Sequence, residues 1–469
     1  MSLTSLNNVE LNENYISNYI DYEDWNMLIQ YLHPKFEITL NDITGKHNPL
    51  MVSQSVIKVL SSLLKELDHK VSLNVNIDLL AALKELFRSL RNCVAFNADV
   101  QALVLQDPFL INSTRDVLNK LLEINYGSDC IGMVLQFLSN VVARNIDGAT
   151  EIWQNFSHII LKLYKGDKCT YNAAALLYNI FYLKKDLIPL CEDVYEHVVK
   201  QCSNRDMTNY DVFLLELFIQ DEHFFSFYVS LKPEHRLTVL SLIVESECLN
   251  KDKPFEMNSE IPAIIASQFK RKSDCILKTV TNYVDQIEPE EVVLLLQILV
   301  KLSANEIYSK KLQCDRSLLI NCAFLLRSIH SLGKESQNNF TVISKLSDIN
   351  YTDSDINKDP IFGFKSNIIR LLGNLCWKHK QNQDEVRDLD CIPLLLDCCN
   401  IDARNPFIIQ WTIFAIRNLC ENNFENQAVI ASMNQQGVVD SATLQEMGLK
   451  LHDDGSNKIS VVPLDSLTK

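Results

Sequence analysis

Hydrophobic residues recur at the three- and four-residue spacing of an amphipathic helix through most of the chain. Val56, Leu60, Leu63 and Leu64 fall on one such face, with Lys58 away from it. Similar stretches recur near residues 130–145, 149–164, 170–183, 209–230, 235–248, 273–303, 314–332, 364–379 and 407–420. Few segments alternate with the two-residue period of a strand, so the pattern predicts an all-α protein.

Glycine and proline support this prediction, because β-hairpins need turn residues at every reversal of the chain. The 469 residues contain 11 Gly and 12 Pro, about half of the usual share. The best strand candidates lie near the C-terminus, at 449–451 and 459–462, with a turn sequence at 453–456 between them. We expect at most one short hairpin there.

One segment interrupts the helical pattern and suggests a division of the chain. Residues 333–360 are rich in Ser, Asn, Asp and Thr and end in Pro360, which is typical of a polar flexible linker or loop. The sequence therefore predicts N-terminal helical repeats over 1–332 and a C-terminal helical block over 361–452. Residues 453–469 form a tail.

Several of the predicted helices end in a similar phrase centred on an asparagine. Asn92 and Asn140 are 48 residues apart, and Asn140 and Asn179 are 39 apart. Asn374 and Asn418 are 44 apart. Armadillo and HEAT repeats recur at about 40–47 residues. The spacing predicts a right-handed α-solenoid of armadillo- or HEAT-like repeats, with about nine or ten units over the whole chain.

Charge and cysteine content indicate which kinds of partner and which cellular compartment to expect. Lys and Arg number 44 and Asp and Glu number 59, which gives a net charge of −15 and argues against a nucleic-acid partner or an anionic membrane surface. The first residues lack the basic and apolar regions of a secretory leader, and no apolar run approaches the length of a membrane span. We therefore expect a cytoplasmic protein without membrane insertion, whose 14 cysteines are free thiols.

The most specific pattern covers 361–450, about a fifth of the chain. In order, it comprises Phe362 to Ser366, Ile369 to Cys376, Asn382 to Asp384, Ile392 to Asp397, Asn405 to Phe407, Trp411, and Ala415 to Leu419. This order and spacing resembles the C-terminal domain of the ataxin-10 family.

The resemblance implies a scaffold of the cytoplasm rather than an enzyme. It links the chain to cytokinesis and cell division, to centrosomal, basal-body, perinuclear or midbody sites, and to neuronal survival and neurite outgrowth. It also implies stimulation of intracellular protein glycosylation, with a glycosyltransferase or signalling proteins as partners. The oligomeric state stays open, and a homo-oligomer is one option.

The asparagine series is the first candidate binding site. In armadillo proteins the third helices line a concave groove, where an Asn amide can donate to and accept from an extended peptide backbone. The alternative is that each amide hydrogen-bonds to a neighbouring repeat. The residues concerned are Asn92, Asn140, Asn179, Asn374 and Asn418.

Arginines near the same phrases can add positive charge to this groove and attract an acidic or phosphorylated peptide. They are Arg91, Arg370 and Arg417, and the alternative is a solvated helix face with ordinary ion pairs. Nuclear-import adaptors carry Trp one turn before such asparagines. Here those positions hold Arg88, Gln136, Ala175, Arg370 and Phe414. This argues against a transport adaptor of the importin type, which we retain as the alternative function.

We predict no catalytic residue, no metal site and no cofactor. Cys391, Cys398 and Cys399 cluster, but no C-x-x-C pair occurs and His379 stands alone, so zinc has no recognisable ligand spacing. The sequence contains no P-loop, dinucleotide fingerprint or metalloprotease motif. An enzyme that joins a cysteine and a histidine from distant positions is the least favoured alternative.

Overall fold

The structure is a computed structural model of the whole chain. It describes residues 9–37, 40–41, 46–47, 50–124, 126–166, 168–204, 207–221, 223–245, 260–280, 287–335, 337–343, 361–433, 445, 448–453 and 459–464. The chain divides into two compact units, residues 1–223 and 224–469, which we call unit 1 and unit 2.

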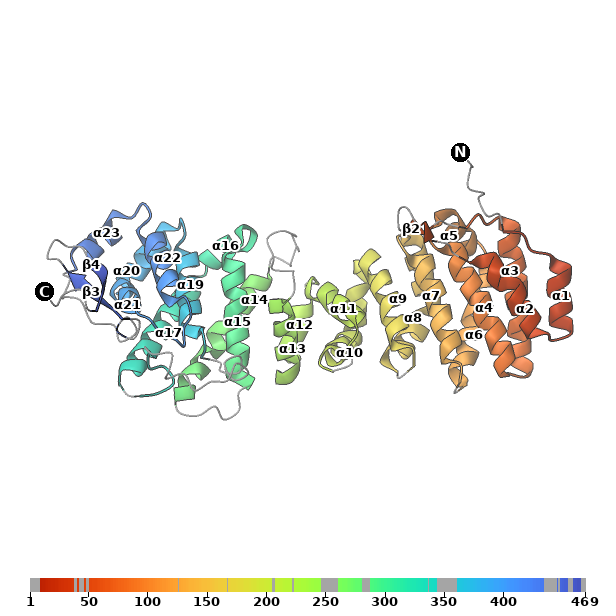
Figure 1. Cartoon of the computed structure of the whole chain (residues 1–469), viewed down its shortest axis with the longest axis horizontal. Coiled ribbons are helices and arrows are strands. Elements are labelled where there is room, and N and C mark those ends of the chain that lie inside the picture. Colours follow the sequence, from red (N-terminus) through yellow and green to blue (C-terminus); the bar gives the residue numbers. More distant parts are fainter. Residues whose placement is uncertain are drawn as a thin grey trace. The chain divides into compact units, whose positions relative to one another are not determined.

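Unit 1 is built from helices joined by short turns (Figure 1). Its elements are α1 Glu13–Asp21, α2 Trp25–Leu32, the 3₁₀ helix η1 His33–Phe36, β1 Leu40–Asn41, β2 Lys46–His47, α3 Gln54–Leu73, α4 Ile77–Val94, α5 Ala98–Leu105, α6 Pro108–Glu123, α7 Ser128–Val142, α8 Ile146–Lys165, α9 Thr170–Leu183, η2 Lys185–Cys191, α10 Glu192–Cys202 and α11 Asn209–Ile219.

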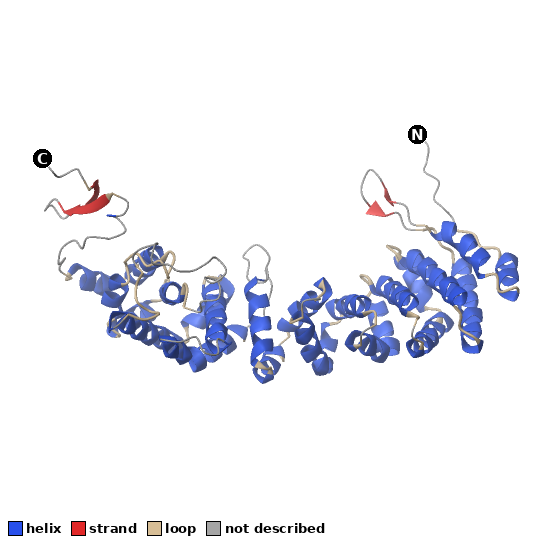
Figure 2. Ribbon diagram, turned by 60° about the horizontal axis from the view of Figure 1, so that its bottom comes forward, coloured by secondary structure: helices blue, strands red, loops and turns tan. Residues whose placement is uncertain are grey.

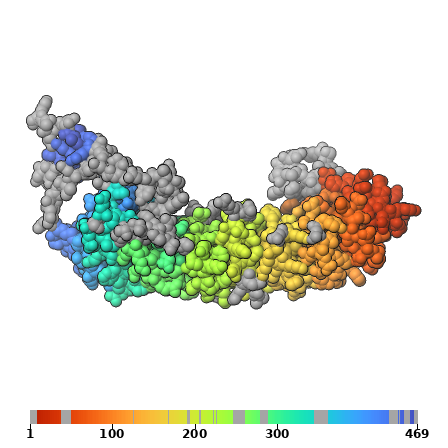
Figure 3. Space-filling model, turned by 90° about the horizontal axis from the view of Figure 1, so that it is seen from below, coloured from red at the N-terminus to blue at the C-terminus, as the bar shows by residue number. Residues whose placement is uncertain are grey.

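The helices of unit 1 stack in two layers. One layer is the row α4, α7, α9 and α11, in which each helix packs on the next; α3, α6 and α8 form a second row against it. In Figure 3 the colours of unit 1 follow one another in chain order, as expected where each helix packs on its neighbours in sequence. Each amphipathic helix thus buries its apolar face in a core that continues from repeat to repeat.

Unit 2 repeats this arrangement, with a small hairpin near its C-terminal end (Figure 2). Its elements are α12 Phe224–Ser230, α13 Pro233–Glu245, α14 Ile261–Lys272, η4 Ser273–Val280, α15 Ile287–Ser303, α16 Glu306–Gln313, α17 Arg316–Glu335, α19 Phe364–Cys376, α20 Lys380–Asp388, α21 Cys391–Asp397, α22 Ile408–Cys420, α23 Phe424–Ala431, β3 Leu449–Asp453 and β4 Ile459–Pro463. Here the row consists of α13, α15, α19 and α22. We call the helices of the two rows the row helices.

A recurring turn follows four of the row helices. The second residue after the helix adopts a left-handed backbone, and the third caps the next helix through its side chain. The left-handed residues are Phe96, Arg144, Lys378 and Asn422, and the caps are Asn97, Asn145, His379 and Asn423. The local sequence after four of the five asparagine phrases, those of Asn92, Asn140, Asn374 and Asn418, therefore encodes the reversal that starts the next helix.

The predicted fold class, an all-α solenoid of armadillo- or HEAT-like repeats, is confirmed. In the C-terminal tail β3 and β4 pair antiparallel, from Leu449 opposite Pro463 to Asp453 opposite Ile459. Within the described part of the chain, no single helix is long and apolar enough to cross a membrane. The bent pair α15 and α16 meets that criterion only in combination, across an angle of 111°.

The predicted linker, 333–360, is described only at its start. α17 continues to Glu335, and Phe340 is buried. The backbone of Phe340 passes so close to Gly333 that a Cβ there would clash with the Phe340 carbonyl oxygen. Residues 344–360 lie outside the described residues, so the linker and the boundaries drawn from it stay a prediction. The division into two units falls elsewhere, after His223.

Candidate functional site

The five predicted asparagines all lie on row helices: α4, α7 and α9 in unit 1, and α19 and α22 in unit 2. In unit 1 the buried Asn92 donates from Nδ2 to the Phe36 carbonyl at 2.6 Å. Asn140, on the next row helix, donates to the Arg91 carbonyl at 3.1 Å. Each amide therefore satisfies a backbone acceptor of the preceding element, which would otherwise lie unpaired between repeats.

The pattern is the same in unit 2. Asn374 is buried and donates to the Val300 carbonyl at 3.2 Å and to Ser303 Oγ at 2.8 Å. Asn418 is buried and donates to the Gly373 carbonyl at 2.9 Å. At Gly373 the two row helices approach so closely that a Cβ would meet Ala415 Cα at 3.0 Å. Glycine thus brings α19 and α22 within reach of this bond.

Asn179, on α9, differs from the other four. Its side chain is half-buried, and its amide makes no hydrogen bond within the described residues. The amide is therefore available to a ligand, whereas the other four amides already bind groups of a neighbouring repeat. Binding of a partner protein by this series stays a prediction.

The three predicted arginines have different surroundings. Arg91 donates to Gln136 Oε1 at 2.7 Å and to Asn92 Oδ1 at 3.0 Å, so it links α4 to α7. Arg370 lies over the ring of Trp411, with 4.2 Å from Cζ to the ring centroid, and burial lowers the pKa of its guanidinium. Arg417 is exposed. Of the three, Arg417 is the one whose charge faces solvent.

Three glutamines that the sequence pattern did not identify join consecutive repeats. Gln101 Nε2 donates to the Asn140 and Ala143 carbonyls, and Gln313 Nε2 donates to the Asn374 and Trp377 carbonyls. Gln383 repeats the pattern with the Asn418 and Glu421 carbonyls. Each glutamine thereby donates to carbonyls at the C-terminal end and C-cap of the following row helix, where the helical hydrogen bonds run out.

A weak sequence signal marks part of this set. Gln101 and Gln383 each follow an N-cap residue, Asn97 or His379, by four positions. Gln427 stands four positions after Asn423 in the same way, but its side chain is exposed and donates to the Cys420 carbonyl of its own repeat. We call Gln101, Gln313 and Gln383, with the bound asparagines Asn92, Asn140, Asn374 and Asn418, the amide ladder.

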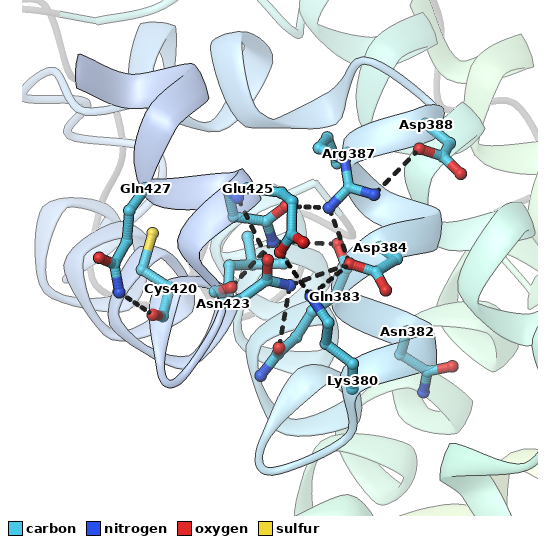
Figure 4. A network of polar contacts seen from close by, with 12 residues as sticks. Lys380, Asn382, Gln383, Asp384, Arg387, Asp388, Cys420, Asn423, Glu425 and Gln427 are labelled. Atoms are coloured by element: carbon cyan, nitrogen blue, oxygen red, sulfur yellow. Dashed lines mark hydrogen bonds and ion pairs between the residues drawn. The ribbon is translucent and has the colours of Figure 1, made fainter.

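Figure 4 shows the ladder residue Gln383 and the polar side chains around it between α20 and α23. Asn423 donates to Gln383 Oε1 at 3.1 Å and to Asp384 Oδ1 at 3.0 Å. Lys380 lies 2.8 Å from Glu425 and 3.2 Å from Asp384. Although partial desolvation opposes ionisation, hydrogen bonds from Arg387, Asn423 and Lys380 hold the pKa of Asp384 below its ordinary value. Most side chains in this view bind one another, and Asn382 donates to the Gln313 and Leu375 carbonyls.

A second polar cluster, which the sequence did not single out, surrounds His330 at the end of α17. His330 Nε2 lies 2.8 Å from Asp397 Oδ2, and its Nδ1 accepts from the buried Lys365 at 3.1 Å. Cys398 Sγ lies 3.6 Å from the same Nδ1. Lys334 also bonds to Asp397, and the group lines a small cavity of about 80 Å³.

This cluster joins a cysteine, a histidine and an aspartate, as a nucleophilic site requires. Burial nevertheless raises the pKa of the Cys398 thiol, although Lys365 acts in the opposite direction. Burial and the Lys365 charge lower the pKa of His330. A buried thiol that holds its proton is a poor nucleophile, so the arrangement lacks the activation that catalysis needs.

The other predicted cysteines are core residues. Cys391 is buried, and burial raises its pKa to about 12; Cys399 is half-buried. His379, whose Nδ1 accepts from the Asn382 backbone amide, caps α20. In the part of the chain that the structure describes, no three His, Cys, Asp or Glu residues converge as metal ligands would.

Comparisons with known proteins agree with the repeat pattern of the C-terminal block. The model of the family described as Spinocerebellar ataxia type 10 protein domain matches residues 364–462. An engineered protein of known structure is 12% identical with a TM-score of 0.31, covering 85% of this chain and 99% of its own. Because this likeness is weak, the fold is assigned from the helices and contacts described above and not from this match.

Similarity to the curated relatives extends well beyond the C-terminal block. Ataxin-10 of Bos taurus is 33% identical over 347 residues, which cover 69% of this chain and 70% of that protein. Ataxin-10 of Xenopus tropicalis is 35% identical over 337 residues, 68% of this chain and 67% of that protein. The Ataxin-10 homolog of Dictyostelium discoideum is 46% identical over 103 residues, 22% of this chain and 17% of that protein. With identity above 30% across two thirds of each vertebrate relative, the chain belongs to the ataxin-10 family.

Proposed function

We propose that this chain is a non-enzymatic scaffold that binds other proteins through the outward faces of its row helices. The observation that carries the proposal is the contrast between bound and free polar groups on these helices. Four of the five series asparagines bind a neighbouring repeat, whereas the half-buried Asn179 on α9 makes no hydrogen bond within the described residues and Arg417 on α22 is exposed. A surface that retains free donors is suited to a peptide partner.

Family membership supports the cellular setting of this proposal. By resemblance to the ataxin-10 family, we propose a cytoplasmic protein of perinuclear, centrosomal, basal-body or midbody sites that acts in cytokinesis and cell division. We likewise propose roles in neuronal survival, neurite outgrowth and intracellular protein glycosylation. A glycosyltransferase and signalling proteins are the partners to test first, together with a second copy of the chain.

Affinity purification with mass spectrometry tests the binding surface. The informative variant combines Asn179→Ala with Arg417→Glu, because neither side chain supports another repeat. We expect selective loss of one set of partners at unchanged thermal stability. The control is Asn418→Ala, which breaks a ladder bond: it should lower stability before it changes the partner set. An unchanged partner set for the double variant would contradict the proposed surface.

The enzyme alternative has one specific observation in its favour, the approach of Cys398 to His330. A thiol-reactive probe under native conditions separates the two functions. We expect the exposed Cys314 to react first and the buried Cys398 to react only after unfolding. Selective labelling of Cys398 in the folded protein, lost in His330→Gln, would instead support the enzyme.

A further inference from the structure

Five aromatic side chains gather on the outward faces of α9 and α11 in unit 1. Tyr171, Tyr178 and Tyr182 follow one face of α9, and Tyr210 and Phe213 lie on α11, which packs beside it. The ring centroid of Tyr178 lies 5.5 Å from Phe213, 5.8 Å from Tyr182 and 6.0 Å from Tyr210. Tyr171 contacts Tyr210 at 5.3 Å. We call these five residues the aromatic patch.

The aromatic patch lies on the surface and is not part of the core. Tyr171 is 54% exposed, Tyr182 is 59% exposed and Phe213 is 41% exposed. Tyr171 and Tyr182 are 11 residues apart on one helix, so the patch runs about 16 Å along α9. That is the length of about five residues of extended peptide. The free Asn179 amide is next to Tyr178 in the same helix.

The electrostatic surroundings of the aromatic patch favour a cation. α9 carries no charged residue, and α11 carries Asp211 and Glu216 but no Lys or Arg. Of the two lysines that follow Tyr182, Lys184 pairs with Asp186 at 3.2 Å and Lys185 donates to Gln220 at 3.1 Å. Glu216 lies near enough to Tyr178 to help raise the pKa of its phenol, after the larger effect of partial burial.

We propose that the aromatic patch binds an extended segment of a partner protein through arginine side chains that stack on its tyrosine rings. The ring faces carry partial negative charge and attract cations. Arginine fits better than lysine, because a planar guanidinium stacks on an aromatic face and is less strongly hydrated than an ammonium. Asn179 lies about 100° around α9 from Tyr178, so its amide pairs with the peptide at the edge of the aromatic patch. This inference depends on the proposed scaffold function and specifies the partner's chemistry.

Fluorescence anisotropy with the full chain tests the proposal directly. The probe is a fluorescein-labelled peptide of six Gly-Arg pairs, compared with Gly-Lys and Gly-Glu peptides of the same length in about 0.1 M salt. We expect the arginine peptide to bind at least about threefold more tightly than the lysine peptide, and the glutamate peptide not to bind. Equal affinity for arginine and lysine peptides would indicate charge attraction alone and overturn the proposal.

Paired variants locate the binding surface. Tyr171→Ser with Tyr182→Ser should weaken the arginine peptide at least about fivefold, because each exposed stacking contact contributes a modest factor. The matched control is Tyr22→Ser with Phe109→Ser, which removes two exposed aromatic side chains elsewhere in unit 1. An equal loss in both double variants, or a loss in neither, would overturn the assignment to the aromatic patch.

The result is separable from the test of the scaffold function. If the arginine peptide fails to bind while the Asn179 and Arg417 double variant still loses partners, only the arginine specificity is wrong. If that double variant keeps every partner and the peptide also fails, the scaffold surface is wrong as well.

Discussion

Asparagine and glutamine side chains have different roles in the block α19–α23 and on the surface of α9 and α11. In the block, Asn374, Gln383 and Asn418 are buried and bind backbone carbonyls of adjacent repeats. On α9 and α11, Asn179 has no such partner and aromatic rings cover the outward face. The comparison teaches that an amide in a repeat motif serves packing wherever a neighbouring helix end comes within reach, and is free for a ligand elsewhere.

The physical reason is the cost of an unpaired backbone group. Helix ends leave carbonyls without partners, and burying one without a hydrogen bond costs about 1–3 kcal/mol. Where α22 ends against α20, Gln383 donates hydrogen bonds to the Asn418 and Glu421 carbonyls. On α9, no hydrogen bond within the described residues holds the half-buried Asn179 side chain.

The largest expected effect comes from removing the central amide of the ladder. Gln383→Ala leaves the Cys376, Asn418 and Glu421 carbonyls and the Asn423 amide short of a partner. We expect the free energy of unfolding of unit 2 to fall by about 3 kcal/mol. Urea unfolding followed by circular dichroism measures it, with hydrogen exchange to locate the change in α20–α23.

Gln427→Ala is the matched control for that variant. This residue stands at the same place in the next repeat, but it is exposed and bonds only to the Cys420 carbonyl. We expect a change within about 0.5 kcal/mol. If Gln383→Ala and Gln427→Ala lower the free energy of unfolding equally, the stabilising effect of Gln383 does not depend on its burial against the next row helix.

A second pair of variants compares the two regions through the same residue type. Asn374→Ala should cost about 1–3 kcal/mol, since it leaves the buried Val300 carbonyl and Ser303 hydroxyl without this donor. Asn179→Ala should change stability by less than about 0.5 kcal/mol. Thermal unfolding of the two variants side by side measures the contrast. Comparable losses would mean that Asn179 has a structural role after all.

The third expected effect is a pH dependence of stability at His330 in unit 2, which peptide binding to the aromatic patch should not share. Burial and Lys365 lower the pKa of His330 in the folded state, and Lys334 adds to this, while Asp397 opposes it. The unfolded chain therefore binds a proton more readily than the folded one. Stability should be full above the ordinary histidine pKa of about 6.5 and fall as the pH drops below it.

Unfolding at pH 7.5 and pH 5.5 measures this dependence, and His330→Gln should flatten it. Cys398, the remaining titratable neighbour of His330, holds its proton throughout this range because burial raises its pKa. Binding of the arginine peptide to the aromatic patch should stay constant over the same interval, since tyrosine titrates near 10. A binding constant that follows the His330 transition would tie the peptide to unit 2 instead.

Much of the fold follows from local sequence. The three- and four-residue spacing predicts the helices, and the residues after four of the five asparagine phrases include the left-handed residue and the cap that begin the next helix. Less of the binding surface could be predicted. The sequence predicts that all five asparagines of the series line one binding groove. In the structure, Asn92 and Asn418 are buried between repeats, whereas Asn179 is only half-buried. Gln383 and His330 carried no signal strong enough to single them out.

The helical class and the repeat period follow from local sequence, because hydrophobic spacing, capping residues and turn conformations act over a few residues at a time. The family follows from similarity to curated relatives over about two thirds of the chain. Only the tertiary structure decided which polar groups are bound and which are free. Gln383 and Asn418 are 35 residues apart, and His330 and Cys398 are 68 apart. Whether such groups meet depends on how closely one repeat packs on the next, as Gly373 shows for α19 and α22, and that distance is set by all the side chains between them.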